Sequence, residues 1–197
     1  MNVKKIVVVG AESTGKSTLC TMLAQHYKTE WCAEFAREYL LKNGTNYNFE
    51  SLEIIAKGQL ALEDECNNKV SKNWQPIADG KFINSHTLTT INHQPLLFID
   101  TNMYVMKVWC EFVFNKCHQF ILDEIVSREY DLYLLCNIDL PWIADELREY
   151  PNEEPRQMLN NIYKDILINQ STPWAEIKGS NYINRFKQAV KAINTIL

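Results

Sequence analysis

Residues 6–18 read IVVVGAESTGKST, an apolar run followed at once by the pattern G-x-x-x-x-G-K-[ST]. Valine and isoleucine favour a buried strand, Gly10 and Gly15 permit a tight turn, and Lys16 opens a segment with helical apolar spacing. Strand, loop and helix follow in the order in which proteins surround phosphate oxygens with backbone N–H groups and the positive end of a helix. The pattern predicts a nucleotide-binding loop; the alternative is a chance glycine-rich turn.

Two side chains of this loop and one aspartate farther along the chain suit phosphate and metal chemistry. The Lys16 ammonium is expected to reach the β- and γ-phosphates, and the Ser17 hydroxyl is expected to bind Mg²⁺. Asp100 directly follows the apolar run LLFI, where a second carboxylate is expected to hold Mg²⁺ opposite Ser17. The alternative for Asp100 is an aspartate that serves a turn or a helix cap.

Composition limits the classes of partner and the number of domains. With 197 residues, 46% of them hydrophobic, we expect a single domain over residues 1–197. A formal charge of −4 gives no broad positive field for DNA or RNA, so a small charged metabolite is the expected partner. The first strand begins too early for a signal peptide, no apolar run approaches a membrane span, and the cysteines form no C-x-x-C pair. We expect a cytoplasmic protein with reduced thiols and no membrane attachment; its oligomeric state stays open.

Strand-like and helix-like stretches alternate along the chain, which predicts an α/β fold of three layers with a mostly parallel sheet flanked by helices. Further strands are expected at residues 30–35, 96–99, 132–136 and 174–178, and helices at 49–70 and 182–196. Gly10, Glu34, Asp100 and Asp139 then fall at the carboxyl ends of strands, where open α/β sheets bind ligands. Residues 71–95 are irregular and are interpreted as an insertion in which Asp79-Gly80 suits a hairpin turn.

The block WCAEFARE carries two further candidates for chemistry. Glu34 is placed where a carboxylate can accept a proton from a substrate hydroxyl during attack on the γ-phosphorus. An exposed glutamate at a helix start is the competing interpretation. Arg37 is expected either to touch phosphate or to pair with Glu34.

Residues 139–157 are predicted to form a lid. This stretch is broken by three prolines and carries Arg148 and Arg156. A segment that delivers guanidinium groups stabilises the charge of the transferring phosphoryl group and excludes water. The alternative is that these arginines simply face solvent. Trp142 is expected to pack under the lid, against a flat substrate ring, or in the core.

At this point the motifs carry a resemblance to a known family. The series GAESTGKST, EFAREYL, a helix containing Gly58-Gln59, FIDTN, YDLYLL, DLPWIADELRE and YINRFKQAV resembles the ribosylnicotinamide kinase domain of the NadR type, through nearly the whole chain. The sequence departs from the family pattern at Asn102, where the family tends to have a second aspartate, and at Glu146, where a glycine is expected.

The resemblance implies a doubly wound P-loop kinase fold and transfer of the ATP γ-phosphate to the 5′-hydroxyl of nicotinamide riboside. It implies that Asp100 serves either Mg²⁺, together with Ser17, or the reacting hydroxyl, and whether Glu34 or Asp100 orients that hydroxyl stays open. The expected substrate contacts are Glu34, Arg37, Gln59 and Trp142. The catalytic set that the resemblance implies comprises Lys16, Glu34, Asp100, Arg148 and Arg156. ATP is expected to contact Gly10, Glu12, Ser13, Thr14, Gly15, Lys16, Ser17 and Thr18.

Two other classes of function stay open from the sequence. One is a kinase for another nucleoside or small alcohol on the same fold. The other is a nucleotide-dependent regulatory switch, in which the product is a conformational change. Neither Asn68-Lys69-Val70-Ser71 nor Asn115-Lys116-Cys117-His118 has the aspartate of the guanine-reading pattern N-K-x-D, which argues against a GTPase switch.

Overall fold

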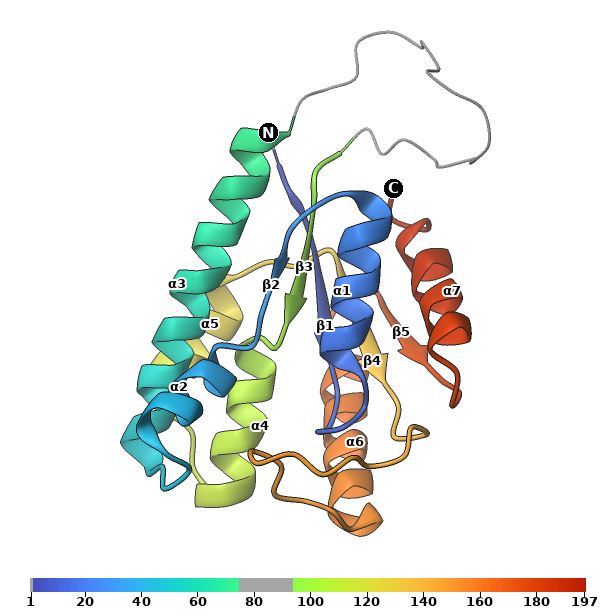
Figure 1. The fold of residues 1–197 in the computed structure, drawn as a ribbon. Coiled ribbons are helices and arrows are strands. Elements are labelled where there is room, and N and C mark those ends of the chain that lie inside the picture. The colour runs from blue at the N-terminus through green and yellow to red at the C-terminus, as the bar shows by residue number, and fades with distance from the viewer. Residues whose placement is uncertain (1, 75–93) are drawn as a thin grey trace, which may run out of the picture.

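A computed structural model describes residues 2–74 and 94–197 of the chain (Figure 1). In chain order its elements are β1 (Lys4–Val9), α1 (Lys16–Tyr27), β2 (Trp31–Cys32), α2 (Phe35–Asn43), α3 (Phe49–Asn73), β3 (Leu96–Asp100), α4 (Met103–Phe114), α5 (Gln119–Ser127), β4 (Leu132–Cys136), α6 (Glu153–Ile168), β5 (Trp174–Ile177) and α7 (Tyr182–Ile193). The strands of this part of the chain form one sheet with the order β2-β3-β1-β4-β5, and every pairing is parallel.

Helices cover both faces of the sheet, which explains why β1 is apolar at consecutive positions. Ile6 and Val8 point to one face and share a buried cluster with residues of α1 and α7. Val7 and Val9 point to the other face and pack with residues of α3, α4 and α6. The predicted α/β fold of three layers is confirmed, and β1 lies at its centre (Figure 1).

The strands lie where the sequence predicts them, with small differences in length. The expected strand at 30–35 is reduced to Trp31–Cys32, and the expected helix at 49–70 continues to Asn73. Helix α4 has no counterpart among the predicted elements, because its valines and aromatic residues are also typical of strands. Most of the expected insertion at 71–95, including the predicted hairpin at Asp79-Gly80, lies outside the described residues.

Within residues 2–74 and 94–197, no helix has both the length and the apolar character that crossing a bilayer requires. This finding concerns helices only.

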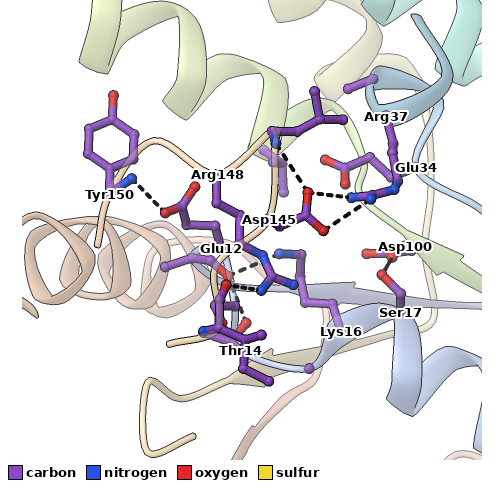
Figure 2. A pocket seen from close by; sticks show the side chains of 18 of the residues that line it. Glu12, Thr14, Lys16, Ser17, Glu34, Arg37, Asp100, Asp145, Arg148 and Tyr150 are labelled. Atoms are coloured by element: carbon purple, nitrogen blue, oxygen red, sulfur yellow. Dashed lines mark hydrogen bonds and ion pairs between the residues drawn. The ribbon is translucent and has the colours of Figure 1, made fainter. Parts of the chain in front are cut away.

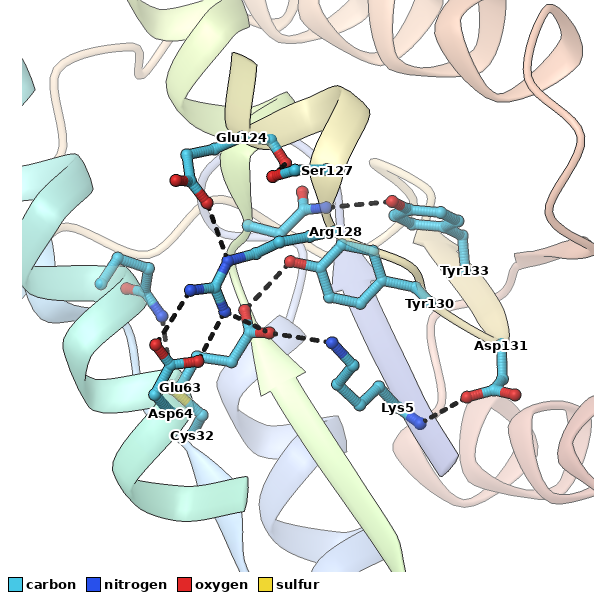
Figure 3. Close-up of polar contacts among 12 residues, drawn as sticks. Lys5, Cys32, Glu63, Asp64, Glu124, Ser127, Arg128, Tyr130, Asp131 and Tyr133 are labelled. Carbon is cyan, nitrogen blue, oxygen red and sulfur yellow. Dashed lines mark hydrogen bonds and ion pairs between the residues drawn. The ribbon is translucent and has the colours of Figure 1, made fainter. Parts of the chain in front are cut away.

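A cluster of charged side chains closes the amino ends of β1 and β4 (Figure 3). At its centre, Glu63 of α3 is 1% exposed and its Oε2 accepts a hydrogen bond from Tyr130 Oη at 3.0 Å. Its Oε1 lies 3.3 Å from Arg128 Nη1 and 3.5 Å from Lys5 Nζ. Both oxygens of this buried carboxylate are therefore engaged.

Arg128 is the second centre of this amino-end cluster, which we define as Lys5, Glu63, Asp64, Glu124, Arg128 and Tyr130. Its Nη1 and Nη2 donate to Asp64 Oδ1 and Oδ2 at 2.7 and 2.9 Å, and its Nε donates to Glu124 Oε2 at 3.0 Å. The hydrogen bonds to Asp64 are the main reason why the pKa of Arg128 is raised, and Arg128 lowers the pKa of Asp64 in return. The cluster ties α3 and α5 to the start of β4.

Candidate active site

A cavity of about 600 Å³ opens at the carboxyl ends of β1 and β3, at the opposite end of the sheet from the amino-end cluster. The phosphate loop, the start of α2 and the segment between β4 and α6 line it (Figure 2). Of the residues predicted to sit at strand ends, Gly10, Glu34 and Asp100 line this cavity. Asp139 does not, and its carboxylate instead accepts a hydrogen bond from the backbone N–H of Gly179.

The two glycines of the phosphate loop are required by its geometry. Gly10 has φ 143°, and a Cβ there would lie 2.6 Å from the carbonyl oxygen of Cys136. Gly15 has φ 77°, and a Cβ there would lie 2.8 Å from Leu140 Cδ1. Gly15 is the N-cap of α1, and no side chain of the described residues caps this helix start. The amides of the first turn therefore suit an anion.

Lys16 and Ser17 project into the cavity from the start of α1 (Figure 2). The Lys16 ammonium donates to the carbonyl oxygen of Ala11 at 3.0 Å. Ser17 Oγ donates to Asp100 Oδ2 at 2.5 Å. Asp100 is fully buried, and burial raises its pKa to about 6, an effect that the Lys16 ammonium opposes and the Glu34 carboxylate strengthens.

Ser17 and Asp100 together fit Mg²⁺. Asp100 Oδ1 is buried and has no hydrogen-bond partner among the described residues. Residues 2–74 and 94–197 contain no site in which three or more side chains of His, Cys, Asp or Glu could hold a metal ion by themselves. Mg²⁺ is usually bound by one or two carboxylates together with phosphate oxygens and waters. The donors therefore fit a metal that arrives with a nucleotide.

The turn after Asp100 is strained and carries one departure from the family pattern. Thr101 has φ 78°, an uncommon conformation for a β-branched residue, and its Oγ1 has no partner among the described residues. Asn102 caps α4 by accepting from Tyr104 N, and its Nδ2 donates to Tyr133 Oη at 3.1 Å. Because Asn102 does not line the cavity, its departure from aspartate removes no carboxylate there.

Glu34 is the N-cap of α2 and lines the cavity, but its side chain makes no capping hydrogen bond with the described residues. Figure 2 shows Glu34, Arg37 and Asp100 on the same side of the cavity. Arg37 also lines the cavity, and its Nη1 and Nη2 donate to Asp145 Oδ1 and Oδ2 at 3.1 and 3.0 Å. Its expected contact with phosphate stays a prediction. The ion pair joins α2 to residues 139–157, and Arg37 is the main reason why the pKa of Asp145 is lowered.

Gln59 does not contact the cavity, which corrects its predicted role in substrate binding. It is 1% exposed, and its Oε1 accepts from Phe35 N at 2.7 Å. Its Nε2 donates to the carbonyl oxygen of Ala33 at 3.2 Å. Gln59 therefore supports the backbone on both sides of Glu34.

The predicted lid, residues 139–157, passes over the phosphate loop without helical structure as far as Asn152, and its last residues form the first turn of α6. Arg148 lines the cavity, and its Nη1 donates to the carbonyl oxygen of Ile143. Arg156 is a correction: it is 5% exposed, lies outside the cavity and has Nη2 3.5 Å from the carbonyl oxygen of Leu140.

Trp142 is also absent from the cavity wall. Its Nε1 donates to Glu12 Oε1 at 3.2 Å, so the indole contacts the phosphate loop. Glu12 also accepts from Tyr150 N at 2.7 Å and from Glu149 N at 3.0 Å (Figure 2). Ser13 Oγ accepts from Ile143 N at 3.0 Å. Two predicted ATP-contacting residues, Glu12 and Ser13, thus line the cavity and also bind the segment.

Some residues that support or line the cavity were not predicted from the sequence. Arg185 of α7 is 2% exposed, and its Nη2 donates to the carbonyl oxygens of Thr14 and Asn137 at 2.9 and 3.2 Å, which holds the phosphate loop in place. The aromatic residues that line the cavity were likewise not predicted as a group: Trp31, Trp109, Phe112, Tyr150, Tyr163 and Tyr182. The arginine stands in the quoted block YINRFKQAV, but its distance in sequence from the loop concealed the contact.

The sequence profile of a family described as an AAA domain matches residues 5–185. The chain belongs to this family. The trifunctional NAD biosynthesis/regulator proteins NadR of Salmonella typhimurium and Escherichia coli are each 23% identical to the chain over 197 residues. These matches cover 99% of the chain and 43% of each relative, so the chain spans less than half the length of the curated relatives. The predicted resemblance to the NadR type is confirmed.

The fold of the chain is similar to solved structures of NadR and of a nucleoside kinase. A NadR structure in complex with NR has a TM-score of 0.67 at 20% identity, covering 98% of this chain and 49% of that one. A NadR structure in complex with NAD and AMP-PNP has a TM-score of 0.64 at 19% identity, with the same coverage. A deoxyadenosine kinase from M. mycoides has a TM-score of 0.59 at 12% identity, covering 98% and 100% of the two chains. This AAA-family chain therefore has a kinase-like P-loop fold.

Proposed function

We propose that the protein is an ATP-dependent phosphotransferase that transfers the γ-phosphate of ATP to the 5′-hydroxyl of nicotinamide riboside, giving nicotinamide mononucleotide. One observation carries the proposal: a single cavity contains the phosphate loop, the pair Ser17 and Asp100, the carboxylate of Glu34 and an aromatic wall. Phosphoryl transfer needs an anion site, a metal site and an oriented acceptor within one enclosed space.

The phosphate loop and the residues around it each have a task in this mechanism. The amides at the start of α1 and the Lys16 ammonium bind the phosphates, and Arg148 stabilises the charge of the transferring group. Ser17 and Asp100 would hold Mg²⁺, which would supply neutralisation of the phosphate charge. Glu34 orients the acceptor hydroxyl, because the proposal assigns Asp100 to the metal and Glu34 is the other carboxylate that lines the cavity at a strand end. Transfer proceeds in line, without a covalent enzyme intermediate.

The cavity also favours a flat, positively charged acceptor. Trp109, Phe112 and Tyr150 offer aromatic faces, and Glu149 adds a carboxylate. Burial raises the pKa of Glu149, while its hydrogen bond from Tyr47 Oη opposes that shift. Aromatic faces and carboxylates both attract a cation such as the pyridinium ring of nicotinamide riboside. The relationship to NadR supports the same acceptor.

Release of ADP in the presence of different acceptors tests the proposal. The protein is incubated with Mg-ATP and, separately, with nicotinamide riboside, deoxyadenosine, uridine and 5′-deoxy nicotinamide riboside, and products are identified by mass. We expect ADP release to depend on nicotinamide riboside and to cease with the 5′-deoxy compound, because the latter lacks the attacking hydroxyl. ADP release that is equal with every acceptor and without any would contradict the proposal and favour a regulatory ATPase.

A second candidate is a kinase for another nucleoside. The fold shared with a deoxyadenosine kinase is the observation that favours it. The same acceptor panel separates the two, since this candidate requires deoxyadenosine or uridine to exceed nicotinamide riboside in kcat/KM.

A further inference from the structure

The carboxylate of Glu12 is unusual for its place in the molecule. It stands inside a loop built to bind phosphate, where a negative charge repels the triphosphate. Nevertheless, among the described residues, neither of its oxygens forms a hydrogen bond or an ion pair with a lysine or an arginine. They accept from three N–H groups that all belong to residues 139–157, namely Trp142 Nε1, Glu149 N and Tyr150 N.

These hydrogen bonds join two parts of the cavity wall. Glu12 belongs to the loop that binds phosphate in the proposed function, whereas Glu149 and Tyr150 line the acceptor side. Glu12 Oε1 accepts from Trp142 Nε1 at 3.2 Å and from Tyr150 N at 2.7 Å. Its Oε2 accepts from Glu149 N at 3.0 Å. Hydrogen bonds to an ionised carboxylate are stronger than those between neutral groups.

The other hydrogen bonds and ion pairs that hold residues 139–157 in place are weaker. Ser13 Oγ accepts one hydrogen bond from Ile143 N, and Arg37 pairs with Asp145 with half of its side chain exposed. Exposed ion pairs contribute little to stability. Glu12 is the group to which the backbone of Glu149 and Tyr150 is bonded directly (Figure 2 shows the contact at Tyr150).

We propose that Glu12 is a positioning residue that fixes residues 139–157 to the phosphate loop, so that the loop which binds the triphosphate also sets the acceptor wall at Glu149 and Tyr150. The inference rests on the proposed function for its kinetic consequence. It assigns Glu12 to acceptor positioning, in place of the ATP contact that its location in the loop suggests.

The test compares Glu12→Gln with Glu146→Gln. Glutamine keeps the size of Glu12 but replaces one acceptor oxygen with an NH₂ donor, which then faces a backbone N–H. Glu146 lies on the same segment, does not line the cavity, and its side chain makes no hydrogen bond with the described residues. Glu146→Gln therefore removes one negative charge from the same segment without breaking a contact. Trp142→Phe removes one of the three donors and keeps an aromatic ring.

For Glu12→Gln we expect the KM of nicotinamide riboside to rise about tenfold, as loss of a hydrogen bond to a charged acceptor produces, while the KM of ATP changes less than about twofold. Acceptor-independent ADP release should increase, because the wall that excludes water is displaced. Trp142→Phe should shift the acceptor KM in the same direction by a smaller factor, and Glu146→Gln should match the wild type. An effect on the ATP KM alone overturns the inference.

Hydrogen–deuterium exchange provides a readout that does not depend on activity. We expect the amides of Glu149 and Tyr150 to exchange faster in Glu12→Gln than in the wild type or in Glu146→Gln, with the melting temperature compared in parallel. Unchanged exchange at these two amides overturns the inference. Faster exchange in a protein that phosphorylates none of the ribosides supports the positioning role and contradicts only the proposed function.

Discussion

The two ends of the sheet each hold a buried carboxylate, and the two differ in how their oxygens are used. At the amino end, Glu63 has both oxygens engaged by Tyr130, Arg128 and Lys5. At the carboxyl end, Asp100 has Oδ2 bonded to Ser17, and Oδ1 has no partner among the described residues. A buried polar atom without a partner costs free energy, so its persistence points to a ligand that completes it.

Backbone conformation alone does not separate the two ends. Thr101 and Ser13 at the carboxyl end have positive φ, and so does Lys28, the C-cap of α1 at the amino end. The side-chain contacts do separate them, because the guanidinium of Arg128 is paired with carboxylates. Unpaired buried polar groups point to functional sites, whereas paired charges serve structure. The amino end is therefore expected to govern stability, and the carboxyl end activity.

The largest effect is expected at the carboxyl end. Lys16→Ala should lower the rate of phosphoryl transfer by about 10²- to 10³-fold, because a charge that stabilises the transition state is lost. Acceptor-dependent ADP release measures it, with Lys187→Ala, an exposed lysine of α7, as the control. Near-normal turnover in Lys16→Ala would show that the phosphate loop does not act in catalysis.

At the amino end we expect a change in stability, not in the rate of phosphoryl transfer, and a free-energy change of similar size. Arg128→Ala should lower the free energy of unfolding by about 3 kcal/mol, because it leaves the buried Glu63 carboxylate without its strongest cationic partner. Urea unfolding measures the loss, and kcat of the folded protein should stay within about twofold of the wild type.

Lys69→Ala is the matched control, since it breaks only an exposed ion pair with Glu65 and should leave the unfolding midpoint unchanged. If Arg128→Ala also left stability unchanged, the contrast between the two ends would be wrong.

The smallest effect is expected where α2 meets residues 139–157. Arg37→Ala and Asp145→Ala should each raise the acceptor KM by about threefold, and the double variant should be no worse than either, because both remove one exposed ion pair. Steady-state kinetics of the three variants measure the coupling. A much larger loss in Arg37→Ala alone would mean that Arg37 contacts phosphate, as the sequence first suggested.

Several site residues could be predicted because their roles are local. The spacing of Gly10, Gly15 and Lys16 defines a loop whose shape depends on near neighbours, and the apolar run before Asp100 identifies a strand end. Gln59 was assigned to the substrate through a resemblance, and Arg156 to the lid through its place in a proline-broken stretch. Neither kind of argument carries information on whether a side chain is buried. Both are buried and contact backbone atoms outside the cavity.

The sequence by itself determined the order along the chain of the strands, the phosphate loop and several helices, because apolar periodicity and glycine positions act over a few residues. Only the tertiary structure decided which side chains meet across the cavity. Glu12 bonds to Tyr150 across 138 positions of sequence, and Arg37 bonds to Asp145 across 108. Such pairs depend on how the sheet brings distant loops to one edge, and no local pattern encodes that geometry.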